Sequence, residues 1–372
     1  MTTELNHPLL KRNVWCILGL PFDNVTLSGA EHIVRTAVNT REHCFVSTPN
    51  LNFAITAQSD ETFFNSVVES DLSLADGMPI VWLARLLGIP ITERVAGSDL
   101  FNQLSEHAGT AKVKVFFFGG QTGIARIAHE KLNLHSQGLV SCGYYDPGFV
   151  SVEEMSRPEI INEINRADAD FIVVALGAKK GQQWIQRNKN QLKAPVCSHL
   201  GAVINFVAEH VERAPRIWQK TGLEWLWRIR QEPALWRRYF GDGTQLIARM
   251  TTQVLPLALY SYRLRHTGQA TIAGSVISDH ENDGLIRLQG SIHYSNLQDL
   301  RHTFVRCLQG GGDIVIDMAD SSYIDAAFIA TLLLFQNYLK QQARKLTLQH
   351  VPRQIYRLLK YSGMLTKFNI HT

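Results

Sequence analysis

Polar residues of types that can do acid–base chemistry follow the strand-like runs in the first part of the chain. Thr48 and Asn50 come directly after one such run, and Asp76 stands before a glycine further on. Threonine and asparagine offer neutral hydrogen-bonding groups suited to sugar hydroxyls, and an aspartate can take a proton from an alcohol. Arg94 can hold a diphosphate through paired hydrogen bonds. An ordinary turn at Asp76 and a surface ion pair at Arg94 remain the alternative interpretation.

Two glycine-containing turns follow later strand-like runs. Gly119 and Gly120 come after the run Val113–Phe118, and Gly177 begins a segment that continues through Gln182. Glycine lets the backbone approach a phosphate closely, and the start of a helix favours negative charge. These positions therefore predict a nucleotide site, although a tight turn and a solvated helix start explain the same residues. The complete GxGxxG with its ribose-binding acid is absent, which argues against a nucleotide-dependent oxidoreductase.

Metal ligands and disulfides are not indicated by the sequence. Asp168 and Asp170 form a DxD pattern, but they precede a strand and so belong to the opposite end of the sheet. The 14 histidines show no HxxxH or HExxH spacing, and the 5 cysteines are never in CxxC spacing. We therefore expect no metal, no cofactor and a reducing compartment.

The composition is that of a folded protein with a modest positive charge. The 372 residues are 45% hydrophobic and 19% charged, which excludes a disordered chain, and the net charge is +4. No apolar stretch reaches the ~20 residues that a membrane-spanning helix needs, and the first residues do not resemble a secretory signal. We expect a cytoplasmic protein without a transmembrane segment.

Strand-like runs alternate with amphipathic segments over residues 13–208, which predicts a mostly parallel sheet with helices on both faces. The predicted strands are Val14–Leu18, Cys44–Ser47, Val113–Phe118, Leu139–Cys142, Phe171–Leu176 and Val196–His199. The predicted helices are Glu61–Glu69, Pro79–Leu87, Ile124–Leu132 and Gly181–Leu192. Near the end of the chain, the predicted strands are Gly284–Leu288, Asp313–Asp317 and Lys345–His350. The helices predicted there are Asn296–Leu308, Ala326–Gln342 and Pro352–Ser362.

Residues 213–265 differ from the rest of the chain in charge and aromatic content. They hold ten Lys or Arg against three Asp or Glu, and four of the seven Trp. Cationic side chains attract anionic lipid headgroups, and tryptophan prefers the membrane interface. We expect this segment to face a membrane and an acceptor through Arg213, Arg216, Trp225, Arg228, Arg237 and Arg238. A packed helical subdomain is the alternative, and Pro256 would break or kink a helix over residues 243–266.

Ordered sequence blocks over residues 13–242 resemble the WecG/TagA/CpsF glycosyltransferases. They include Gly19-Leu20-Pro21-Phe22-Asp23, Thr48-Pro49-Asn50, Ala75-Asp76-Gly77-Met78-Pro79, Glu93-Arg94-Val95-Ala96-Gly97-Ser98-Asp99, Phe118-Gly119-Gly120, Leu176-Gly177, Arg213-Ala214-Pro215 and Gly222-Leu223-Glu224-Trp225-Leu226-Trp227-Arg228. The resemblance implies an inverting, metal-independent transfer from a UDP-sugar to a polyprenyl-diphosphate-linked sugar. It also implies that Asp76 is the general base and Thr48 an active-site residue. Asn50 and Arg94 would line the donor pocket.

The chain departs from the family's usual pattern at one helix start and at two later positions. The family usually reads Pro-Lys-Gln-Glu where this chain has, in order, Lys179, Lys180, Gly181 and Gln182. Asn205 stands where an aspartate is common, and the glycine usual before Arg213 is displaced. The resemblance therefore implies a donor pocket altered in part.

Residues 284–370 resemble a STAS domain, the fold of anti-sigma-factor antagonists. The match includes Asp313–Met318 and Ser322–Phe328. In signalling members a serine at the start of a helix is phosphorylated, whereas here Ala326 and Ala327 follow Asp325. Because neither alanine has a hydroxyl group, we expect a binding or dimerisation module, with a packing domain as the alternative.

Together these features predict an α/β protein with four segments. They are a Rossmann-like, mostly parallel glycosyltransferase domain (1–212), a basic helical appendage (213–266), a linker (267–283) and a STAS-like domain (284–372). We expect exopolysaccharide synthesis at the inner face of the cell membrane, without nucleic acid, and a protein partner or self-association through the STAS-like domain. The alternative is a non-catalytic regulatory scaffold made of a degenerate transferase domain and a STAS interaction domain.

Overall fold

A computed structural model describes most of the chain. The described residues are 7–209, 214–215, 217–218, 221–231, 233–268, 270, 274–278 and 284–371. They form two compact units. The larger unit consists of Val25–Val81 and Thr92–Asp242, and the smaller unit of Met1–Asn24, Trp82–Ile91 and Gly243–Thr372.

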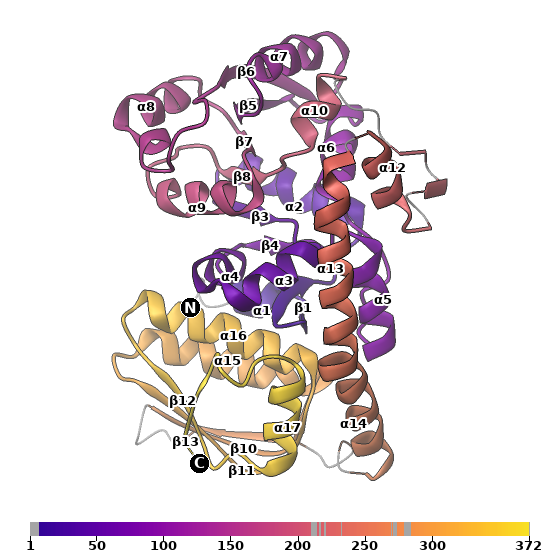
Figure 1. Ribbon diagram of the computed structural model, residues 1–372. Helices are drawn as coiled ribbons and strands as arrows, with labels where there is room; N and C mark the ends of the chain where they lie inside the picture. The colour runs from indigo at the N-terminus through magenta and orange to yellow at the C-terminus, as the bar shows by residue number, and fades with distance from the viewer. Residues whose placement is uncertain are drawn as a thin grey trace. The chain divides into compact units, whose positions relative to one another are not determined.

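A six-stranded parallel sheet of order β4-β3-β8-β7-β5-β6 forms the centre of the larger unit (Figure 1). Its strands are β3 (Cys44–Ser47), β4 (Leu72–Ser73), β5 (Val113–Gly119), β6 (Leu139–Tyr145), β7 (Phe171–Ala175) and β8 (Val196–His199). The surrounding helices are α2 (Leu27–Thr40), α3 (Leu51–Ser59), α4 (Glu61–Val68), α6 (Gly97–Glu106), α7 (Ile124–His135), η2 (Glu154–Ser156), α8 (Pro158–Arg166), α9 (Ala178–Asn188) and α10 (Val203–Val207). The predicted parallel α/β fold is confirmed, and β4 is a strand that the sequence did not reveal.

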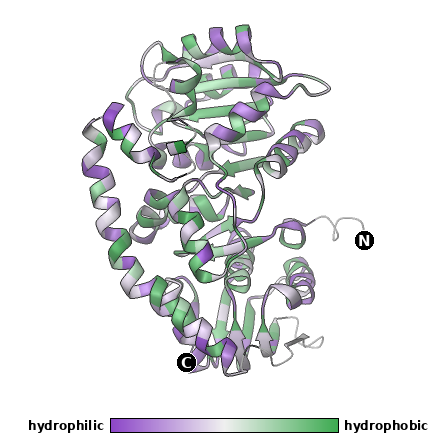
Figure 2. Cartoon of the chain, turned by 90° about the vertical axis from the view of Figure 1, so that its right-hand side faces the viewer, coloured by the Kyte–Doolittle hydropathy of each residue, from purple (hydrophilic) through white to green (hydrophobic). Residues whose placement is uncertain are grey.

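The strands of this sheet are buried on both faces. In β5, Val115 and Phe117 belong to the cluster formed with α2, α6 and α7, whereas Phe116 and Phe118 belong to the cluster formed with α8 and α9. Phe118 stacks on Trp184 of α9 with 4.2 Å between ring centroids. Strands covered on both faces read as continuous apolar runs, and Figure 2 shows them mostly in green, the colour of apolar residues.

The described part of the segment predicted as a basic appendage is helical from Glu224 onward. It contains α12 (Glu224–Gln231), η3 (Pro233–Leu235), α13 (Trp236–Arg249), the π-helix η4 (Met250–Val254) and α14 (Leu255–His266). Pro256 does not end the helix, because it falls in the first turn of α14, directly after the π-helix. A π-turn shifts the hydrogen-bonding register and so accommodates the missing N–H and the bulky ring of proline. Helices α5 (Met78–Leu87) and α13 each contribute residues to both units.

The smaller unit contains a five-stranded sheet of order β13-β12-β11-β10-β9. Its strands are β9 (Ser275–Ser278), β10 (Leu285–Ile292), β11 (Ile314–Ile324), β12 (Leu346–Gln349) and β13 (Asn369–His371). Its other helices are α1 (Pro8–Lys11), η6 (Tyr294–Asn296), α15 (Leu297–Gln309), α16 (Ala326–Gln341) and α17 (Arg353–Tyr361). The predicted strand and helix order is confirmed, but antiparallel β9 lies in the range predicted as a linker.

The first residues of the chain pack in the smaller unit rather than with the six-stranded sheet, which differs from the predicted boundary at residue 212. Strands β1 (Val14–Ile17) and β2 (Leu20–Asp23) form an antiparallel hairpin that packs on α16. Leu18 and Gly19 turn the hairpin with φ of 49° and 84°, so the predicted strand stops one residue early. Both faces of α16 are buried, which explains the docking of so apolar a hairpin.

Candidate active site

The polar residues after β3 and β4 lie at one edge of the parallel sheet. These strands are neighbours in the same direction, so Thr48 and Asp76 follow adjacent strand ends. The backbone N–H of Asp76 donates to the carbonyl of Pro49 at 3.1 Å, and that of Leu74 donates to the carbonyl of Ser47 at 2.8 Å. The two loops are thereby bound to each other, and Asp76 lies beside the Thr48–Asn50 segment.

The carboxylate of Asp76 has an altered acidity. Burial raises its pKa to about 6, and the carboxylates of Glu224 and Asp99 act in the same direction, while Arg94 and Arg228 oppose them. Part of the surface of this residue nevertheless stays exposed. A carboxylate with a pKa near 6 is ionised at neutral pH and is a stronger base than an ordinary aspartate.

Arg94 is fixed between two carboxylates. Its Nη1 donates to Glu224 at 2.9 Å and its Nη2 to Asp99 at 2.6 Å, with only 13% of the side chain exposed. Its guanidinium charge is therefore balanced locally, and it holds α12 against the sheet edge. The sequence suggested a diphosphate ligand for Arg94 but gave no indication of Glu224 as its partner, because 130 residues separate them.

Thr48 and Asn50 have local structural contacts as well. Thr48 is 6% exposed, and a Cβ at Gly97, the first residue of α6, would lie 3.1 Å from its Cγ2. The side-chain oxygen of Asn50 accepts from the backbone N–H of Phe53 at 3.2 Å and caps α3. Gly97 therefore permits the close approach of α6 to Thr48, while capping fixes the orientation of the Asn50 amide.

The predicted glycine turns meet at the switch point of the sheet. Strands β5 and β7 are neighbours whose following helices lead in opposite directions, the place where parallel sheets bind ligands. The backbone N–H of Gly120 donates to the carbonyl of Ala175 at 2.8 Å. Gly119 has φ of 92°, and a Cβ there would crowd Leu176. Gly177 caps α9 with open space around its Cα. The three glycines thus leave bare backbone at this edge.

The start of α9 is more enclosed than the sequence suggested. Gln182 is completely buried, and its Nε2 donates to the Ser47 hydroxyl at 3.0 Å, beneath the predicted donor crevice. Lys179 pairs with Asp60 at 2.6 Å, and Lys180 donates to the carbonyl of Val150 at 3.4 Å. The structure therefore gives Gln182 and the lysines contacts within the protein, which suits a supporting role better than direct nucleotide contact.

His199, at the end of β8, explains the unusual Gly181. A Cβ at position 181 would overlap the His199 imidazole, whose Nε2 donates to the carbonyl of Leu176. Burial lowers the pKa of His199, so the ring is neutral at neutral pH. Sequence reasoning missed His199, because no local pattern reveals that its ring fills the space above residue 181.

In the described part of the basic segment, some of the predicted residues lie near Asp76 and others lie on the protein surface. Arg228 lies with its Cζ 5.7 Å from the Phe206 ring centroid and influences Asp76. Trp225 is 40% exposed and contacts Tyr239. Arg237 and Arg238 are exposed at the start of α13. The predicted residues Arg213 and Arg216 lie outside the described residues.

The DxD pattern lies at the opposite edge of the sheet, as predicted. Asp168 pairs with Lys114 and Asp170 with Arg41, both at 2.7 Å. Among the described residues no group of three or more His, Cys, Asp or Glu side chains is placed to hold a metal. The two aspartates act as ion-pair partners where the strands begin.

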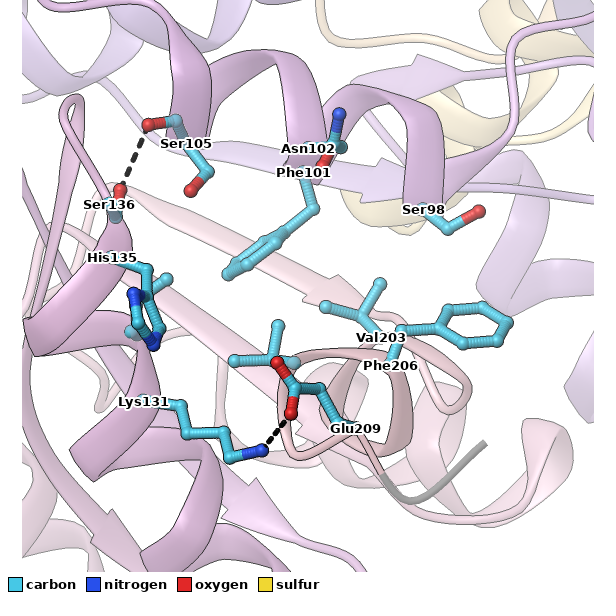
Figure 3. A pocket seen from close by; sticks show the side chains of 12 residues that line it. Ser98, Phe101, Asn102, Ser105, Lys131, His135, Ser136, Val203, Phe206 and Glu209 are labelled. Carbon is cyan, nitrogen blue, oxygen red and sulfur yellow. Dashed lines mark hydrogen bonds and ion pairs between the residues drawn. The ribbon is translucent and has the colours of Figure 1, made fainter. Parts of the chain in front are cut away.

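A cavity of about 840 Å³ opens between α6, α7 and α10 (Figure 3). Apolar Phe101, Leu132 and Val203 line it together with polar residues, and Lys131 pairs with Glu209 at its rim. Thr48, Asn50, Asp76 and Arg94 are not among its lining residues. The cavity therefore adds no group to the Asp76 site.

In the smaller unit, the residues before α16 form a structural cap for that helix. Asp325 accepts hydrogen bonds at 2.8 Å from the backbone N–H of Phe328 and of Tyr294. Ala326 and Ala327 begin α16, while Ser321 and Ser322 lie buried in β11, which extends beyond the predicted strand Asp313–Asp317. The first residues of α16 therefore carry no hydroxyl that could be phosphorylated.

Comparisons with known proteins give consistent matches for both parts of the chain. A family model described as "Glycosyl transferase WecG/TagA/CpsF family" matches residues 15–258, and one described as "Mlab, STAS domain" matches residues 275–368. An N-acetylglucosaminyldiphosphoundecaprenol N-acetyl-β-D-mannosaminyltransferase of Bacillus spizizenii is 28% identical over 66% of this chain and 92% of its own length. Proteins of the same name from Bacillus subtilis (26% identical) and Staphylococcus aureus (24% identical) each align over 60% of this chain and 85% of their own length. None of the described helices combines the length and apolar character needed to cross a bilayer.

Proposed function

Because the chain belongs to the WecG/TagA/CpsF family of glycosyltransferases, we propose that it moves a sugar from a UDP-sugar to a polyprenyl-diphosphate-linked sugar. The observation that carries this proposal is Asp76, an aspartate of raised pKa at a sheet edge shared with Thr48. The similar proteins act, by their names, on a polyprenyl-diphosphate-linked acceptor. The product would enter a surface polysaccharide such as an exopolysaccharide.

In the proposed reaction, Asp76 takes the proton of the acceptor hydroxyl. The resulting oxygen attacks the anomeric carbon from the face opposite UDP, a new glycosidic bond forms, and the bond to the UDP oxygen breaks with inversion. The raised pKa of Asp76 brings its basicity closer to the working pH, which improves general-base catalysis. No metal is part of this proposal.

The donor would lie along the strand ends, with its diphosphate near the bare backbone of Gly119, Gly120 and Gly177. Thr48 and Asn50 would contact the sugar or the nucleotide. Arg228 is the cation best suited to the departing diphosphate, because Arg94 is already held by two carboxylates. Arg94 would instead keep Glu224 and Asp99 in place around Asp76.

We also propose that the first turns of α13 and the neighbouring α12 face the membrane that carries the acceptor. Their exposed apolar side chains Trp225, Trp236 and Phe240 are 40%, 52% and 69% exposed, and Arg237 and Arg238 lie between them in sequence. Tryptophan and arginine together favour the boundary between headgroups and lipid chains. The protein would then be peripheral at the inner membrane face.

The test is release of UDP from a panel of UDP-sugars in the presence of a short-chain prenyl-diphosphate-linked sugar. We expect one donor to support release that depends on the acceptor. The variant Asp76→Asn should lower the rate of release about 10²- to 10⁴-fold, and Asp168→Asn, the same change at the opposite sheet edge, should leave it unchanged. Release by Asp76→Asn at the wild-type rate would remove Asp76 as the base.

The scaffold alternative depends on the altered start of α9. The His199 ring fills the space beside Gly181 that a side chain at position 181 would occupy. This close packing favours a site that has changed and still functions over one that has lost its function. A folded wild-type chain that releases no UDP with any donor and acceptor offered would favour the scaffold.

A further inference from the structure

Helix α14 carries its apolar side chains on the outside. Leu255, Leu259 and Tyr262 recur at positions i, i+4 and i+7, so they form one stripe, and they are 41%, 70% and 62% exposed. The opposite side of the helix holds buried Leu264 and Ser261. A helix in water normally has the reverse arrangement, so this stripe is suited to contact with an apolar partner.

Helix α17 of the STAS-like module has a cationic outer face. Arg353, Arg357 and Lys360 are exposed on it together with Tyr356, while Ile355 and Leu358 point into the unit. No aspartate or glutamate occurs between residues 326 and 372, whereas seven lysines and arginines do. The charge of this face is therefore not balanced by nearby acids in sequence.

The two helices lie side by side in the smaller unit (Figure 1). Tyr260 of α14 contacts Tyr361 of α17 with 6.1 Å between ring centroids. The Cζ of Arg357 lies 5.8 Å from the Tyr260 ring centroid. Arg263 and Arg265 add positive charge on either side of the α14 stripe. Residues 243–268 contain no aspartate or glutamate that could balance this charge in sequence. The cations of α17 thus lie on the helix that packs beside α14, which carries the exposed apolar stripe.

From this arrangement we propose that α14 and α17 form a docking surface for an anionic lipid bilayer, in which the STAS-like module takes part. The stripe of Leu255, Leu259 and Tyr262 would enter the headgroup region, as apolar faces of interfacial helices do. The cations of α17 would contact acidic headgroups, each raising affinity roughly fivefold. A nucleic acid would use the cations but would leave the exposed leucines without a partner. The inference rests on the proposed function, because a membrane carries the acceptor proposed there.

The test is co-sedimentation of the full chain with phosphatidylcholine vesicles that contain or lack phosphatidylglycerol. We expect binding only with the anionic lipid, and at least a tenfold loss of affinity in the double variant Arg353→Gln, Lys360→Gln. The matched control is Lys340→Gln, Lys345→Gln, which removes the same charge from two exposed lysines near the end of α16 that do not belong to α14 or α17, and should bind as the wild type does. Leu259→Ser should weaken binding severalfold at unchanged charge. Thermal melting confirms that each variant is folded.

Equal affinities of the two double variants, or equal binding to both kinds of vesicle, would overturn the proposal. Loss of single-stranded oligonucleotide binding in the α17 variant, with Leu259→Ser binding vesicles normally, would show a polyanion site instead. UDP release with a short-chain, water-soluble acceptor should be normal in the α17 variant. That readout separates failure of the docking surface from failure of the transferase proposal.

Discussion

Each unit of the molecule has an aspartate shortly after a parallel strand, and the two differ in what contacts their carboxylates. Burial raises the pKa of both Asp76 and Asp325. Asp325 uses its two oxygens to accept backbone hydrogen bonds from Phe328 and Tyr294. Apart from burial, the pKa of Asp76 is shifted by the charges of neighbouring arginines and carboxylates, and no hydrogen bond contributes to the shift. A buried strand-end aspartate is therefore available for chemistry only where its oxygens are not already used by the backbone.

The two aspartates should differ most in their effect on turnover. Asp76→Asn should lower the rate of sugar transfer about 10²- to 10⁴-fold, the usual contribution of a general base. Asp325→Asn should leave the rate per folded molecule unchanged, since an amide oxygen can still cap α16. Steady-state UDP release by both variants measures the difference. Similar losses of rate in the two variants would contradict a catalytic role for Asp76 and a structural role for Asp325.

A third strand-end residue, His199, has a role in packing that can be measured through stability. Gly181→Ala should destabilise the protein by about 1–3 kcal/mol, because the new Cβ overlaps the His199 ring. Adding His199→Ala should recover part of this loss, whereas independent effects would simply add. Chemical denaturation of the single and double variants measures the coupling. Additive losses would show that the contact is not the cause.

The structural role of Asp325 predicts an effect on stability. Asp325→Ala should lower the free energy of unfolding by about 1–2 kcal/mol, because the cap of α16 is lost. Thermal denaturation of the full chain checks this, with Asp320→Ala, an exposed aspartate of the same unit, as a control that should change little. An unchanged melting temperature in Asp325→Ala would contradict the assigned cap.

The raised pKa of Asp76 should also make the stability of the protein depend on pH. Its folded pKa of about 6 lies above the ordinary value, so the folded state binds the proton more tightly than the unfolded state. The contribution of Asp76 to stability is therefore present below pH 3.8 and is lost as pH rises through 6. Asp76→Asn should melt higher than wild type at pH 8, with a smaller difference at pH 4. The opposite trend would exclude the raised pKa.

The sequence predicted more of the sheet edge than of what surrounds it. Asp76 follows β4, a strand that the sequence did not reveal. The place of Thr48 could be predicted, because it follows a predicted strand and parallel strands end at one edge. The partnership of Arg94 with Glu224 could not, because it depends on how α12 returns to the sheet. The docking of the β1–β2 hairpin on α16 was equally hidden, since an apolar hairpin does not specify which apolar helix it covers. Local patterns determined the elements, and tertiary packing determined their partners.

The role of Asp76 as the base can be read from the dependence of kcat/KM on pH. If Asp76 is the base, the rate should be half-maximal near pH 6, where its carboxylate loses the proton, and should level off above it. The residual activity of Asp76→Asn should lack this transition. A transition near pH 6 that persists in Asp76→Asn, or a wild-type rate that is flat from pH 5 to 8, would contradict the assignment of Asp76 as the base.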